Sequence, residues 1–207
     1  MSTAQDSGTG EGSSLTPAQK RALLARLLAD GKARAVPAAE DVLVLFERQA
    51  ERTPDAPAVS TGQERLTYGE LNTRAGLYAD ALRAAGAGPG AVVGLAMARG
   101  VACIAGLIGI LKAGGTCLPL EPDDAPVRLA RLKASAHFLL SDDGASALDG
   151  APGPSQEPAL ALLAPDRTPC ALPRRAVAER LAWMRQSFEL GPVDICLFAS
   201  SLHDVSS

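Results

Sequence analysis

The sequence predicts an α/β fold, in which a mostly parallel sheet is flanked by helices. Short apolar runs of strand length alternate with longer amphipathic runs through the middle of the chain. Such alternation is typical of parallel strands that are covered by helices. Hydrophobic residues make up 47% and charged residues 21% of the 207 residues, so the chain is long and apolar enough to bury a core.

The first 37 residues are predicted to lie outside this fold. Residues 1–14 are polar and rich in glycine and serine, so we expect a disordered arm, because they offer too little apolar surface to offset the cost of ordering. Residues 15–37 are predicted to contain an amphipathic helix and a linker, since Thr16 and Pro17 suit a helix start and leucines recur at helical spacing. This helix either packs on its own domain or serves as a docking element.

The elements of the main domain follow from hydrophobic periodicity and from turn residues. The expected helices span residues 38–50, 69–85, 100–113, 126–135 and 174–188. The expected strands span residues 58–60, 66–68, 92–97, 116–120, 138–141 and 195–199. Residues 144–173 interrupt this alternation with several prolines and little periodicity, so we predict a long loop there.

Composition argues against several classes of function. A net charge of −3 and an aromatic content of 3% give no basis for binding nucleic acid. The longest apolar run, residues 101–111, is far shorter than the ~20 residues of a membrane span. The N-terminus does not resemble a signal peptide, so a cytoplasmic location without a membrane partner is expected. No metal site is predicted, because the cysteines have no metal-ligand spacing; we interpret them as buried free thiols: Cys103, Cys117, Cys170 and Cys196.

Three glycine- or threonine-containing motifs have structural interpretations. Thr67 can cap the helix that follows it, and Glu70 completes a capping box. Gly114 and Gly115 can end a helix, because glycine tolerates the left-handed conformation. Residues 86–90, Gly-Ala-Gly-Pro-Gly, follow a predicted helix and precede a predicted strand. A dinucleotide-binding motif needs the reverse order, so this run is predicted to be a plain helix-ending loop.

The same regions carry a family resemblance. Residues 66–71 and 111–122 resemble the first two signature motifs of the adenylation domains of nonribosomal peptide synthetases, which are AMP-dependent synthetases/ligases of the adenylate-forming superfamily. Residues 45–59 are similar to the beginning of such a domain. The resemblance implies that residues 38–207 form an incomplete N-terminal subdomain of the adenylate-forming ligase fold, truncated before the later motifs.

The resemblance weakens where the family binds the phosphates of ATP. There the family has a Ser/Thr/Gly-rich loop that ends in Pro-Lys-Gly, in which glycines let backbone N–H groups approach phosphate oxygens and the lysine adds positive charge. Residues 165–172 align with this loop: Pro169 matches the proline, Cys170 and Ala171 replace the lysine and glycine, and Asp166 adds negative charge. We therefore expect no catalytic residue, and no binding of ATP and magnesium, the cofactors of the intact family, by the chain alone.

One residue is a candidate substrate contact. Residues 201–206 resemble the family motif Phe-Asp-x-Ser, whose aspartate holds the amino group of the amino-acid substrate. Asp204 matches that aspartate, whereas His203 stands in place of the phenylalanine. The resemblance therefore makes Asp204 the candidate substrate-binding residue of this chain. The alternative is a solvated carboxylate without a function.

These features lead to three functional hypotheses. The first is a truncated, degenerate adenylation domain that does not complete amino-acid adenylation and acts as an interaction or accessory module in a peptide synthetase pathway. Its expected partner is a synthetase module, a carrier protein or a complementary fragment. The second is one part of a split ATP-dependent amino-acid adenylating ligase, which is an enzyme only with its other part. The third is a gene remnant without function.

Overall fold

The computed structural model describes residues 40–120, 130, 133–148, 159–163 and 169–198, all within the compact unit Ala38–Ser207. The predictions for residues 1–14 and 15–37 and the candidate Asp204 lie outside the described residues. Most of the helix predicted over residues 126–135 also lies outside them, although Ala130 and Lys133 are helical.

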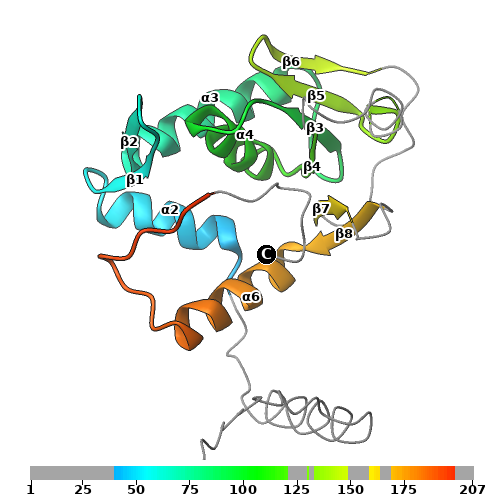
Figure 1. Ribbon diagram of the computed structural model, residues 1–207. Helices are drawn as coiled ribbons and strands as arrows, with labels where there is room; N and C mark the ends of the chain where they lie inside the picture. Colours follow the sequence, from blue (N-terminus) through cyan, green and yellow to red (C-terminus); the bar gives the residue numbers. More distant parts are fainter. Residues whose placement is uncertain (1–39, 121–129, 131–132, 149–158, 164–168, 199–207) are drawn as a thin grey trace, which may run out of the picture. The chain divides into compact units, whose positions relative to one another are not determined.

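A six-stranded sheet forms the centre of the fold, with the strand order β6-β5-β3-β4-β7-β8 (Figure 1). Its three inner pairs are parallel: β3 with β5, β3 with β4, and β4 with β7. The two outer pairs, β5 with β6 and β7 with β8, are antiparallel. The strands are β3 (Val92–Ala96), β4 (Thr116–Pro119), β5 (Phe138–Ser141), β6 (Gly144–Ala147), β7 (Ala159–Leu163) and β8 (Pro169–Pro173). The predicted α/β class and mostly parallel sheet are confirmed.

The described helices agree with the predicted ones to within a few residues. They are α2 (Val42–Arg52), α3 (Tyr68–Ala84), α4 (Val101–Lys112) and α6 (Arg174–Ser187). Between α2 and α3 the two short predicted strands form a separate antiparallel hairpin, β1 (Pro57–Ser60) and β2 (Arg65–Thr67). The strands β1 and β2 are therefore not part of the parallel sheet, whose first strand in the chain is β3.

The two faces of the sheet carry different side chains, as the two-residue period of a strand requires. Val93, Leu95, Cys117 and Leu140 point to one face and join the buried cluster that includes side chains of α3 and α4. Side chains of the opposite parity contribute to a second, smaller cluster: Leu118, Leu120, Ala136, Val92, Ala96, Leu139 and Leu148. The larger cluster is the main core of the described part.

Close contact between α3 and α4 depends on glycine. A Cβ atom added to Gly109 of α4 would lie 2.7 Å from the Cβ atom of Tyr78 and 2.9 Å from the backbone oxygen of Ala75, both in α3. Neither atom can move without shifting a helix, because one is backbone and the other is attached directly to it. Gly109 therefore sets how near the two helices approach.

The predicted helix ends are confirmed. The Thr67 Oγ1 accepts from the Glu70 backbone N–H at 3.2 Å, and the Glu70 carboxylate accepts from the Thr67 N–H at 2.8 Å, which completes the capping box of α3. Gly114, just after α4, has a φ of +84°, the left-handed conformation expected for it.

The prediction of a long loop over residues 144–173 is wrong, because three strands lie within it. β6 returns from β5 through a tight turn that ends at Gly144, whose φ is +121°. β7 is a continuous run of small and apolar residues, Ala-Leu-Ala-Leu-Leu, and shows no alternation by which a strand could be recognised. Pro169 and Pro173 stand at the two ends of the edge strand β8, a position where proline is tolerated.

The strand predicted over residues 195–199 is also not found in its described part, residues 195–198. The alternation of Ile195 and Leu197 suits a strand, but a strand also needs a neighbour for its backbone hydrogen bonds. No strand of the described ranges pairs with this segment.

Candidate functional site

The segment that aligns with the family's phosphate-binding loop lies in the β7–β8 hairpin. The two strands pair from Ala159 opposite Pro173 to Leu163 opposite Pro169. Residues 164–168, which connect the strands and include Asp166, lie outside the described residues, whereas Cys170 and Ala171 belong to β8. The structure thus divides the aligned segment between a connection and a paired strand.

The backbone of β8 is poorly suited to hold an anion. Pro169 and Pro173 have no N–H group, and proline in an edge strand places its nitrogen away from the paired strand. Alternate residues of a strand direct their backbone N–H groups to the same side. Ala171 alternates with Pro169 and Pro173, so its N–H is the one backbone donor that these three residues offer at the free edge of β8. No lysine stands in this strand. The described residues of β8 therefore offer few backbone donors and no positive charge to an anion.

Arg174, the first residue of α6, is the cation nearest to β8 in the sequence, but it is engaged elsewhere. Its Nη2 donates to the backbone oxygen of Leu111 at 2.6 Å, and its Nη1 lies 3.8 Å from the Asp41 carboxylate. Its side chain is 13% exposed, and its Nε has no hydrogen-bond partner. Arg174 thus connects α6 to the C-terminal end of α4 and to the N-cap of α2, and it does not serve as a free positive charge.

Two further cations gather at the same end of α4. Arg83 of α3 donates to the backbone oxygen of Lys112 at 2.6 Å, and the Lys112 ammonium forms an ion pair with Glu47 of α2. Positive charge near the last carbonyls of a helix is favourable, because the helix dipole places partial negative charge there. This junction of Arg83, Lys112 and Arg174 joins four helices, and its chemistry is structural.

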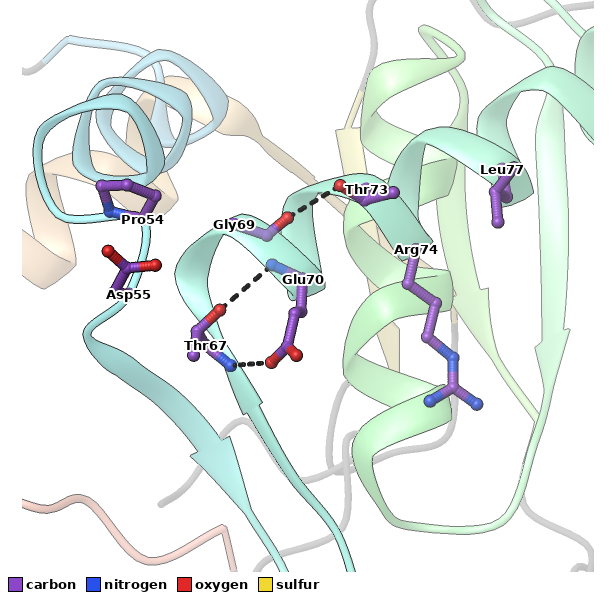
Figure 2. A pocket seen from close by; sticks show the side chains of 8 residues that line it. All are labelled: Pro54, Asp55, Thr67, Gly69, Glu70, Thr73, Arg74 and Leu77. Atoms are coloured by element: carbon purple, nitrogen blue, oxygen red, sulfur yellow. Dashed lines mark hydrogen bonds between the residues drawn. The ribbon is translucent and has the colours of Figure 1, made fainter.

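A shallow hollow of about 440 Å³ lies at the start of α3 (Figure 2). Figure 2 shows that Thr67 and Glu70 are occupied with each other through the capping box. Arg74 donates to the Glu64 carboxylate at 2.6 Å, and this hydrogen bond raises the pKa of the Arg74 guanidinium. The polar groups of the hollow thus stabilise the helix start, and the arrangement lacks an activated nucleophile or base.

The cysteines are only partly as predicted. Cys103 and Cys117 are buried free thiols, and burial raises the pKa of Cys117, so that its thiol is unreactive. The prediction is wrong for Cys196, which is exposed like the other residues of the segment 191–198 that follows α6. The side chain of Cys170 lies outside the description. In the described ranges no cluster of histidine, cysteine and carboxylate side chains could hold a metal ion.

Sequence reasoning missed Arg174 as the link between three helices. Its partners Asp41 and Leu111 are far from it in the sequence, so no local pattern could have marked it.

The described helices are all too short or too polar to cross a membrane.

Comparison with known proteins identifies relatives of this chain. Residues 46–169 match the family model described as "AMP-binding enzyme". Bacitracin synthase 1 of Bacillus licheniformis is 51% identical over 78 residues, which are 38% of this chain and 2% of that protein. Zwittermicin A synthase ZmaJ of Bacillus cereus is 45% identical over 101 residues, which are 49% of this chain and 18% of the relative. The chain thus spans a small part of these relatives.

Solved structures agree with the sequence comparison. The nonribosomal peptide synthetase FmoA3 matches 82% of this chain and 21% of its own, with 31% identity and a TM-score of 0.71. The N-terminal subdomain of Klebsiella oxytoca NpsA matches 65% of this chain and 41% of its own. Its TM-score is 0.55 at 17% identity, so it supports the fold alone. The matched region corresponds to the N-terminal part of synthetase adenylation domains.

Proposed function

Because the chain belongs to the AMP-binding enzyme family, we propose that it is an adenylation-domain-like interaction module of a nonribosomal peptide synthetase pathway and forms no aminoacyl adenylate by itself. The synthetase relatives support the pathway. The partner in this proposal is a synthetase module, a carrier protein or a complementary fragment, and the place of action is the cytoplasm.

The β7–β8 hairpin is the observation that carries this proposal. The two strands of the hairpin are paired along their length, while the glycines and the lysine of the family's phosphate-binding loop are missing from the aligned residues 165–172. Pro169 matches the proline of the family pattern, whereas Cys170 and Ala171 replace its lysine and glycine. Because the strand pairing is kept while the lysine and glycines of the phosphate-binding loop are replaced, a role in interaction is favoured over a role in adenylation.

Exchange of labelled pyrophosphate into ATP tests this proposal directly. The purified full chain, incubated with ATP, magnesium and a mixture of amino acids, is expected to show no amino-acid-dependent exchange. Calorimetric titration with magnesium and ATP is expected to show no binding in the low millimolar range. Amino-acid-dependent exchange by the chain alone would overturn the proposal.

A loop transfer tests the same observation in a second background. In an adenylation domain with measurable exchange, the segment aligned with residues 165–172 is replaced by the sequence Pro-Asp-Arg-Thr-Pro-Cys-Ala-Leu of this chain. We expect the exchange to be lost while the free energy of unfolding stays close to that of the parent domain. Full exchange after the transfer would show that these residues are compatible with catalysis.

The split ligase is the second candidate function, and one observation favours it. Large apolar side chains between Leu181 and Leu197 are exposed in this chain alone. Such exposure is expected of a surface that another polypeptide covers in a complex. In that arrangement the other polypeptide would have to supply the phosphate-binding groups, because this chain does not. Exchange that requires both polypeptides would select this candidate over the first.

A further inference from the structure

We draw no further inference here: the strongest candidate, the patch of exposed apolar side chains on α6 and on the segment 191–198 that follows it, carries none, because nothing in the structure shows what covers it.

Discussion

The sheet core and the α6 surface use similar side chains in opposite ways. The α6 surface comprises exposed apolar residues of α6 and of the segment after it: Leu181, Trp183, Phe188, Val193, Ile195 and Leu197. In the sheet core, built by α3, α4 and β3 to β5, Leu82, Ile110 and Leu140 are completely buried. On the α6 surface, Ile195 and Leu197 remain almost completely exposed. The difference teaches that, among the described residues, apolar packing is complete around the sheet core and incomplete on the α6 surface. The folding free energy must come mainly from the sheet core, whereas the α6 surface is available for recognition.

The largest expected contrast comes from one substitution made in both regions. Ile110→Ala should lower the free energy of unfolding by about 2–5 kcal/mol, because it leaves a cavity among fully buried neighbours. Ile195→Ala should change it by less than about 0.5 kcal/mol, because Ile195 is 95% exposed. Urea unfolding measures both values. If Ile110→Ala does not fold, Ile110→Val, with an expected loss of about 0.5–1.5 kcal/mol, replaces it. Equal losses at the two positions would contradict the division into two regions.

A second contrast sharpens the description of the sheet core itself. Gly109→Ala should destabilise the chain by about 1–3 kcal/mol, because the new Cβ atom meets the backbone of α3. Gly76→Ala, in α3, meets nothing within 4 Å and should stabilise by up to about 1 kcal/mol through helix propensity. The shift in the urea midpoint decides the sign in each case. A stable Gly109→Ala variant would show that α3 and α4 can separate at little cost.

A third contrast concerns how α6 is attached to the core. Arg174→Met should cost about 1–3 kcal/mol, because the substitution removes the charged donor to the Leu111 carbonyl and the ion-pair partner of the Asp41 carboxylate. Arg175→Met removes an exposed arginine that pairs with Glu179, and should cost less than about 0.5 kcal/mol. Hydrogen exchange would show whether α6 loosens alone. Similar effects at the two positions would argue against the Arg174 link.

The last contrast involves no change in stability and compares the reactivity of one cysteine in each region. An alkylating reagent at pH 8 should modify Cys196 in the native chain, because this thiol is exposed. Cys117 should resist, because burial blocks access and raises its pKa, which lowers the fraction of reactive thiolate at that pH. Mass spectrometry of peptides identifies the modified site. Rapid modification of Cys117 before unfolding would mean that the sheet core opens readily.

Local chemistry explains which parts of the fold could be predicted. The capping box at Thr67 and Glu70 and the left-handed Gly114 involve residues within one turn, so the sequence contains all the information that determines them. The helices α3 and α4 and the strands β3 to β5 follow one another as runs of the expected length between turn residues, and they were predicted to within a few residues. The β7 strand lies in a proline-rich stretch without that alternation, so its pairing with β4 and β8 was not visible.

The candidate site divides in the same way. That residues 165–172 lack the glycines and the lysine of a phosphate-binding loop is a property of composition, and it is readable without a structure. The use of Arg174 to hold α6 against α2 and α4 depends on residues that are far apart in the chain, and only the fold brings them together. The role of Asp204 stays a prediction, because it lies outside the described residues.

By itself, the sequence determined the α/β class, the main helices, their caps and the departure from the family's phosphate-binding pattern, because each follows from periodicity or from residue types at short range. The tertiary structure decided that residues 144–173 contribute strands, that Gly109 controls the approach of two helices, and that the α6 surface stays exposed. The physical reason is that strand pairing and burial are properties of partners. Whether Ile195 is a core residue depends on what lies opposite it, and the identity of the residue does not contain that information.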